Sequence, residues 1–226
     1  MSEGDPEAEK RRAAEAAVEY VEDGMVVGLG SGSTAAYAIE CLGEAVANGL
    51  SVVGVPTSFQ SAALARSVGV PVRSLEDVTM VDVAIDGADQ VASGALIKGG
   101  GAAHTREKLV DAAADTFVVV VDSGKMAETL DQAVPLEVLP DAPAAVARQV
   151  SGTGGTATIR SAVAKSGPVV TDNGNLVLDA DFGEITDPTG LASRLSTIPG
   201  VIDHGLFVGL ADVIITGTAD GTETRQ

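Results

Sequence analysis

The stretch LIKGGGAAHTREKLV, at residues 96–110, contains the residues best suited to catalysis. Lys98 is followed by three glycines, and Glu107 lies in the helical pattern after them. Consecutive glycines cost more conformational entropy than a plain turn justifies, so we expect the backbone to approach a bound molecule here. Lys98 could stabilise a developing oxyanion while Glu107 acts as a base, and a proton beside a carbonyl can be moved by such a pair. An exposed Glu–Lys surface pair is the alternative.

A second loop, within GLGSGSTA at residues 28–35, separates an apolar run from a helical pattern. Its glycines let the backbone approach an anion, its hydroxyls can donate, and the following helix offers free N–H groups, which suits a single phosphate. It is not a P-loop, because no Gly-Lys-Ser/Thr follows. NAD binding is disfavoured, because the dinucleotide glycine spacing is missing and no acidic residue closes the next β-rich run. An ordinary turn with a helix N-cap stays open.

Two more polar loops follow apolar runs. DGAD, at residues 86–89, carries paired carboxylates that could accept sugar hydroxyls, bind a divalent metal or cap the next element. A metal is the weaker reading, because His104 and His204 show no ligand spacing. Lys125, in VDSGK, could meet a phosphate or a sugar oxygen, which matters more in a chain that repels anions.

The elements that must position these loops are short β-rich runs alternating with helical patterns, which predicts parallel βαβ units. The predicted strands lie at residues 25–30, 51–56, 81–85 and 117–122, and the predicted helices at 34–47, 58–68 and about 105–114. Ligands bind beyond the carboxyl ends of such strands, so the four loops should share one edge of the sheet.

After Lys125 the pattern changes to that of a smaller α+β unit. The final β-rich runs, within residues 205–218, could rejoin the first sheet or close the second, and periodicity leaves both open.

Composition and charge limit the kinds of partner that the protein can bind. The chain has 226 residues and a formal net charge of -18, so nucleic acid and anionic membranes are poor partners. Molar salt would screen the self-repulsion, which suggests a salt-adapted host. The start of the chain has no apolar signal-peptide core and no stretch is long enough to span a membrane, so we expect a cytoplasmic protein. The lone Cys41 is expected to be a small buried apolar residue.

Five motifs in order, GLGSGSTA, DGAD, IKGGGAAHTREK, VDSGK and VVTDNGN, resemble those of ribose-5-phosphate isomerases of the A type. The resemblance covers nearly the whole chain. It implies a cofactor-free enzyme of the pentose phosphate pathway that interconverts ribose 5-phosphate and ribulose 5-phosphate. The pairing of Glu107 with Lys98, and the lack of a plausible metal-ligand set in the sequence, favour metal-free proton transfer through a cis-enediolate. The resemblance also implies a homodimer or homotetramer of two-domain α/β subunits. A Rossmann-like catalytic domain (residues 1–131 and 206–226), with a mostly parallel sheet and helices on both faces, would be interrupted by a small ferredoxin-like α+β domain (132–205).

Carried over residue by residue, the resemblance places the catalytic base at Glu107. In the hypothesised mechanism, Asp86 and Lys98 assist ring opening and move the proton between the sugar oxygens. Lys10 matches less closely a lysine that can approach the phosphate. The positions that match the substrate-binding loops are Ser31, Gly32, Ser33, Thr34, Asp86, Gly87, Ala88, Asp89, Lys98, Gly99, Gly100, Gly101 and Lys125.

Two residues depart from the family pattern. Gln90 stands where a glutamate is common, and His104 stands where an apolar residue is more usual. The sequence alone does not determine how Gln90 and His104 change the electrostatics around the site. A related sugar-phosphate deaminase is an alternative, although it should carry a histidine-containing acid-base arrangement. A non-catalytic sugar-phosphate sensor is another, although such regulators usually carry a DNA-binding domain.

Overall fold

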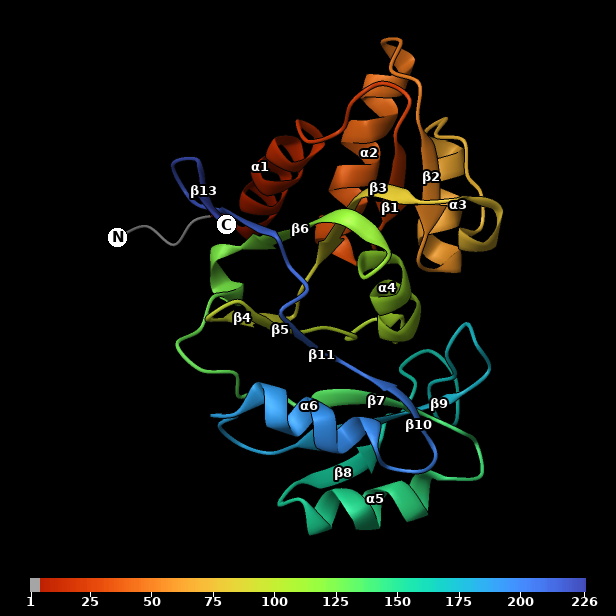
Figure 1. The fold of residues 1–226 in the computed structure, drawn as a ribbon, viewed down its shortest axis with the longest axis vertical. Coiled ribbons are helices and arrows are strands. Elements are labelled where there is room, and N and C mark those ends of the chain that lie inside the picture. The colour runs from red at the N-terminus through yellow and green to blue at the C-terminus, as the bar shows by residue number, and fades with distance from the viewer. Residues whose placement is uncertain (1–4) are drawn as a thin grey trace. The chain divides into compact units, whose positions relative to one another are not determined.

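The computed structural model describes residues 5–226; residues 1–4, the start of the acidic leading segment, lie outside the described residues. The chain forms two compact units (Figure 1). The first contains the residues up to Ala88, Arg106–Met126 and Leu210–Gln226, and the second contains Asp89–Thr105 and Ala127–Gly209. Residues 89–105 therefore group with the second unit, whereas the predicted boundaries put them with the first.

The first unit is built on a six-stranded sheet in the order β13-β12-β6-β3-β1-β2. All neighbours are parallel except β13, which pairs antiparallel with β12 at the edge. The mostly parallel sheet predicted from the apolar runs is confirmed. Its strands are β1 (Val26–Leu29), β2 (Val53–Pro56), β3 (Val81–Gly87), β6 (Ala114–Asp122), β12 (Val213–Gly217) and β13 (Thr222–Arg225).

Helices cover both faces of this sheet. The helices are α1 (Pro6–Val18), α2 (Ser33–Ala47), α3 (Phe59–Ser67) and α4 (His104–Asp111). Successive residues of β1 point to opposite faces of the sheet. Val27 and Leu29 pack in one core cluster with Ile39 of α2. Gly28 faces the other side, where an added Cβ would lie 2.7 Å from Val110 of α4. Glycine at position 28 thus lets a helix approach the sheet closely.

The second unit contains a four-stranded antiparallel sheet in the order β10-β7-β9-β8. The chain order βαββαβ with this strand order is the ferredoxin-like arrangement. Its elements are β7 (Val134–Val138), α5 (Pro143–Gly152), β8 (Thr156–Ile159), β9 (Leu176–Asp181), α6 (Pro188–Ser196) and β10 (Val201–His204).

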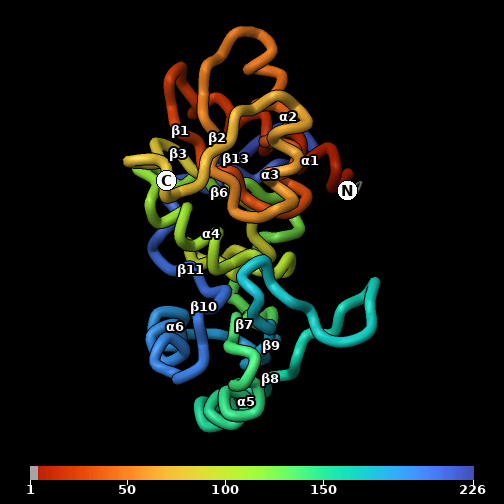
Figure 2. The backbone as a smooth tube through the Cα atoms, turned by 90° about the vertical axis from the view of Figure 1, so that its right-hand side faces the viewer, coloured from red at the N-terminus to blue at the C-terminus, as the bar shows by residue number. Residues whose placement is uncertain are grey.

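Both helices of this unit pack on one face of the sheet. Leu136 of β7 and Leu178 of β9 belong to one buried cluster with Val146 of α5 and Leu191 of α6. The long irregular segment between β8 and β9 extends away from the sheet (Figure 2). Within residues 5–226, none of the helices combines the length and hydropathy needed to cross a membrane.

The final β-rich runs divide between two sheets. β12 rejoins the first sheet beside β6, while β11 (Leu206–Val208) pairs with β5 (Ala95–Ile97) in a small sheet completed by β4 (Gln90–Ala92). The β4–β5 hairpin was not predicted. Its turn, Ser93-Gly94, has positive φ at both residues, as two-residue hairpins prefer.

Candidate active site

The Gly-Ser loop links β1 to α2 in the first unit. Gly32 is the N-cap of α2, with φ +102° and no side chain to cap the helix. By contrast, α3 begins with a capping box between Ser58 and Ser61. The first N–H groups of a helix need acceptors, so the uncapped start of α2 is suited to hold an anion.

Asp86 closes this loop from the neighbouring strand. It lies at the carboxyl end of β3, fully buried, and its Oδ1 accepts the N–H groups of Ser31 (3.1 Å) and Gly87 (2.7 Å). An added Cβ at Gly30 would overlap the Asp86 carboxylate, so only glycine fits there. The structure thus brings the predicted Gly-Ser loop and the DGAD loop together, because β1 and β3 are parallel neighbours.

The hydroxyl of Ser31 is hydrogen-bonded to residues at the end of β2, a contact that was not predicted from the sequence. Ser31 Oγ lies 2.9 Å from Thr57 Oγ1 and donates to Ser58 Oγ at 2.6 Å. Thr57 in turn donates to the carbonyl of Leu29. These hydroxyls immediately follow an apolar strand, and that position was the available signal. These hydrogen bonds restrict the conformation of the loop.

Glu107 lies in the first turn of α4 and is only 4% exposed. One turn later, Val110 packs over Gly28 and Ala84 of the sheet. Residues three apart share a helix face, and α4 leads directly into β6, so its N-terminus lies toward the carboxyl ends of the strands. Glu107 therefore occupies the same edge of the sheet as Asp86.

Lys125 ends the short 3₁₀ turn Ser123–Lys125 after β6, the strand beside β3, and is partly buried. The same turn is fastened to α1, because Glu9 accepts the N–H (3.0 Å) and the hydroxyl (2.6 Å) of Ser123. These hydrogen bonds lower the pKa of Glu9. The fourth predicted loop thus lies at the same sheet edge.

Lys10 of α1 is bound to Glu7 at 2.7 Å. The hydrogen bond to Glu7 raises the pKa of Lys10, and the nearby Asp122 adds to this effect. Lys10 is therefore a cation engaged within its own helix, and its approach to a phosphate stays a prediction.

In the second unit, Lys98 follows β5 and is 2% exposed. The backbone N–H of Lys98 donates to the carbonyl of Gly205 at 2.8 Å, and the side-chain Nζ lies 5.3 Å from the centre of the Phe207 ring. The cation–π contact and the buried stem restrict this side chain to few rotamers.

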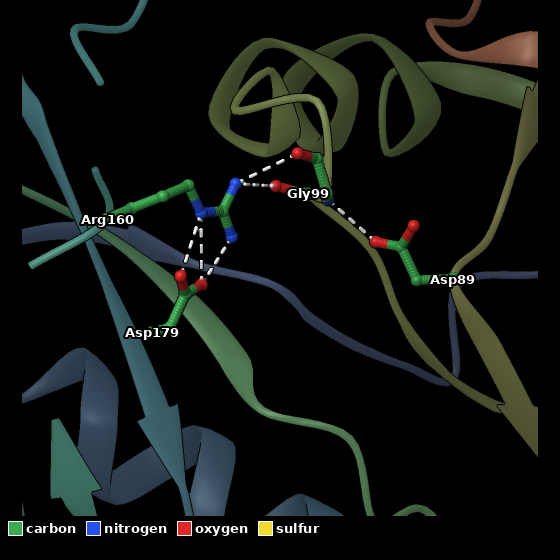
Figure 3. A network of polar contacts seen from close by, with 5 residues as sticks. Asp89, Gly99, Arg160 and Asp179 are labelled. Atoms are coloured by element: carbon green, nitrogen blue, oxygen red, sulfur yellow. Dashed lines mark hydrogen bonds and ion pairs between the residues drawn. The ribbon is translucent and has the colours of Figure 1, made fainter. Parts of the chain in front are cut away.

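The glycines after Lys98 form a tight turn closed by a hydrogen bond from the Ala102 N–H to the Gly99 carbonyl, 2.9 Å long. Gly99 has φ +107°, and an added Cβ there would lie 2.7 Å from the His104 ring. Gly100 donates its N–H to Asp89 at 2.7 Å (Figure 3). At Gly101 an added Cβ would meet nothing within 4 Å. The predicted residues Asp89 and Gly100 are thus in direct contact.

The two departures from the family pattern have structural partners. His104 is fully buried and occupies the space left by the missing Cβ of Gly99. Gln90 donates to Asp131 Oδ1 at 2.6 Å and accepts the N–H groups of Asp131 (2.9 Å) and Gln132 (3.1 Å). A glutamate could not donate to Asp131, so glutamine suits this position.

Within residues 5–226 no three His, Cys, Asp or Glu side chains cluster as metal ligands would. The lone Cys41, expected to be buried, is only partly buried, and burial raises the pKa of its thiol.

Comparisons with known proteins agree with this geometry. Residues 53–221 match the family described as ribose 5-phosphate isomerase A (phosphoriboisomerase A). The ribose-5-phosphate isomerase A of Natronomonas pharaonis is 62% identical, with 98% of both chains covered. That of Haloarcula marismortui is 61% identical over the whole of this chain and 98% of its own.

Solved structures show the same fold. A D-ribose-5-phosphate isomerase in complex with phospho-erythronic acid is 45% identical, with a TM-score of 0.96 over 98% of this chain and 99% of its own. The ribose 5-phosphate isomerase A of Methanocaldococcus jannaschii is 43% identical, with a TM-score of 0.93 over 96% of this chain and 98% of its own. On this evidence, the chain belongs to the ribose-5-phosphate isomerase A family.

Proposed function

We propose that the chain interconverts D-ribose 5-phosphate and D-ribulose 5-phosphate by proton transfer through a cis-enediolate, with Glu107 as the base. The activity follows from the family, since relatives that share 54–62% identity over nearly the whole chain are ribose-5-phosphate isomerases A. The roles of individual residues are the part that we infer. The observation that carries them is the burial of Glu107 at the sheet edge that also holds the uncapped N-terminus of α2.

The mechanism assigns defined roles to Glu107, Asp86 and Lys98. Glu107 removes the C2 proton of the open-chain aldose, and the C–H electrons form the C1–C2 double bond of the enediolate. Glu107 then returns this proton to C1. The proton on the C2 hydroxyl moves to the C1 oxygen with help from Asp86 and Lys98, which also assist ring opening. Lys98 and the amides of the glycine turn stabilise the enediolate charge.

The phosphate orients the substrate. The start of α2, with the backbone of Gly32, Ser33 and Thr34, supplies N–H donors, and Lys125 supplies a positive charge. Binding a part of the substrate that does not react supplies orientation for the part that does. Asp89, which grips the turn at Gly100, keeps that turn in one conformation.

The two alternative functions are not favoured. A deaminase or a sugar-phosphate sensor would require that full-length relatives of such high identity differ from this chain in chemistry. No arrangement of the described residues specifically favours either one.

The test is conversion of ribose 5-phosphate by the purified protein in molar KCl with EDTA present. Glu107→Gln should lower kcat by about 10²–10⁴-fold, because general base catalysis is lost. Glu44→Gln, at an exposed glutamate on α2, is the matched control and should behave as wild type. Full turnover by folded Glu107→Gln would refute Glu107 as the catalytic base. A folded wild-type protein without activity would refute the proposed isomerase function.

Three further expectations remain proposals. The enzyme would serve the non-oxidative branch of the pentose phosphate pathway, act in the cytoplasm and assemble as a homodimer or homotetramer. Size-exclusion chromatography with light scattering in molar KCl tests the assembly, and a monomeric mass would contradict it.

A further inference from the structure

The glycine turn that follows Lys98 has two backbone positions that need external support. Gly99 and Ala102 both have positive φ, +107° and +60°. Alanine rarely adopts the left-handed region, and glycines leave a turn free to sample other conformations. The turn therefore depends on neighbouring side chains to keep a single shape.

Arg160, which immediately follows β8, supplies that support (Figure 3). Its Nη1 donates to the carbonyl of Gly99 at 2.8 Å and to the carbonyl of Gly100 at 3.0 Å. These bonds join residues about sixty positions apart, 61 for the first and 60 for the second. The guanidinium thus holds two successive peptide carbonyls of the turn.

Asp179 of β9 fixes the other side of the guanidinium. Arg160 Nε lies 2.9 Å from Asp179 Oδ2 and 3.2 Å from Oδ1, and Nη2 also donates to Oδ1. Only 17% of the Arg160 side chain and 31% of the Asp179 side chain are exposed. A planar fork held at both edges has little freedom, whereas a lysine could reach only one of these partners at a time.

Asp89 also fixes the turn, because its carboxylate accepts the Gly100 N–H. Gly100 is then held at both its N–H and its carbonyl. Among residues 5–226, no acceptor binds the N–H groups of Gly99 or Gly101. These two amides are thus the ones that the turn can offer to an anionic oxygen.

We infer that Arg160, held by Asp179, is a positioning residue for the isomerase reaction: it acts through the carbonyls of Gly99 and Gly100 to aim the amides of the glycine turn. It does not touch the substrate. The inference rests on the proposed function, because the turn matters to catalysis only if its amides meet the enediolate. Misplacing such donors by about 1 Å can cost 10²-fold in rate.

The experiment compares Arg160→Met, Arg160→Lys and Asp179→Asn with wild type in molar KCl, by steady-state kinetics on ribose 5-phosphate. Arg160→Met should lower kcat by about 10–100-fold with KM changed less than about threefold, and Arg160→Lys should recover only part of the loss. The double variant Arg160→Met/Asp179→Asn should be no worse than Arg160→Met, because the two residues act as a unit. Arg148→Met, at an exposed arginine of α5 in the same unit, is the matched control.

A second readout separates positioning from general stability. Amide hydrogen exchange at Ala102, which is bonded to the Gly99 carbonyl, should accelerate in Arg160→Met, while exchange at the strands of the unit stays as in wild type. Externally added guanidinium should restore part of the kcat of this variant. If Arg160→Met does not fold, kcat and amide exchange of Arg160→Lys and Asp179→Asn are compared with those of wild type instead.

The outcomes are distinct. Unchanged kcat in folded Arg160→Met, or an equal loss in Arg148→Met, overturns the inference while leaving the proposed function intact. An inactive wild type removes the proposed function and the inference with it. Active wild type with inactive Glu107→Gln and slow, guanidinium-rescued Arg160→Met supports both.

Discussion

The carboxylate of Asp86 and the backbone N–H of Ser31 form a hydrogen bond of 3.1 Å that joins the carboxyl ends of two parallel strands. The same carboxylate oxygen also accepts the N–H of Gly87. One fully buried side chain therefore shapes the Gly-Ser loop at the sheet edge where Glu107 lies. The structural and the chemical tasks of Asp86 can be separated by substitution.

Asp86→Asn should retain the fold but lose most of the activity. The amide oxygen of asparagine can still accept both backbone N–H groups, whereas an amide cannot take up and release a proton as the proposed role of Asp86 requires, so we expect kcat to fall by about 10²-fold or more. Asp82→Asn is the control, since Asp82 lies on the same strand and its carboxylate accepts the N–H of Val26. Thermal melting and steady-state kinetics measure both effects. Normal kcat in Asp86→Asn would show that Asp86 is purely structural.

The glycine turn allows a matched pair of substitutions. Gly101→Ala should fold as wild type, because an added Cβ meets nothing within 4 Å, yet the methyl group would occupy the space of the substrate and lower kcat/KM by about 10-fold or more. Gly100→Ala should also lower the melting temperature, because its Cβ would lie 2.8 Å from Asp89 Oδ1. Unaltered kinetics in Gly101→Ala would mean that the substrate does not approach this position.

Gln90→Glu should destabilise the protein by about 1–3 kcal/mol at pH 7. The substitution replaces a buried donor with a second carboxylate facing Asp131, so a hydrogen bond is lost and like charges meet. The loss should shrink at acidic pH as one carboxylate binds a proton. Denaturant unfolding at both pH values measures it, with the exposed Gln132→Glu as control. Equal stability of Gln90→Glu and wild type at pH 7 would contradict the assigned contact.

Glu137 should make stability depend on pH in the acidic range. Burial raises its pKa, but side-chain hydrogen bonds from Asn175, Asn173 and Thr171 outweigh this effect, so the pKa lies below its usual 4.5. A depressed folded-state pKa stabilises the protein above the unfolded value, and this stabilisation is lost as pH falls through the folded value.

Comparison with Glu137→Gln provides the measurement for this effect. Wild type should be more stable above about pH 4.5, and the difference should decrease steadily below it. Denaturant midpoints between pH 3 and 7 report it. A difference that stays constant over this range would show that the carboxylate charge contributes nothing.

Salt should stabilise the fold. With a net charge of -18, the chain repels itself at low ionic strength, and the Debye length falls to about 3 Å at 1 M salt. We expect the melting temperature to rise markedly from 0.1 M to molar KCl, whereas KM should increase because phosphate binding is screened. A melting temperature that is the same at both salt concentrations would refute salt adaptation.

Several elements could be predicted from the sequence because their signals are local. Continuous apolar runs gave the positions of β1, β2, β3 and β6, and the hydrophobic periodicity gave α2 and α3 to within a few residues. Short strands without a strong apolar pattern were missed. β8, with the sequence TATI, is mostly exposed, and β13 is exposed throughout. The residue roles and the domain boundaries remain predictions.

The sequence by itself determined which residue types could do the chemistry. Glycine and serine follow β1, aspartate lies at the end of β3 and lysine follows β6, and the carboxyl ends of these parallel strands share an edge. The glycine turn after Lys98 instead follows β5, which pairs antiparallel with β4 and β11 in the second unit. Only the tertiary structure decided the supporting contacts: Thr57 on Ser31, Gln90 on Asp131, and Arg160 on the glycine turn. The physical reason is distance along the chain. Hydrophobic period and turn propensity act over a few residues, whereas Arg160 and Gly99 are 61 residues apart and meet only when the second unit is folded.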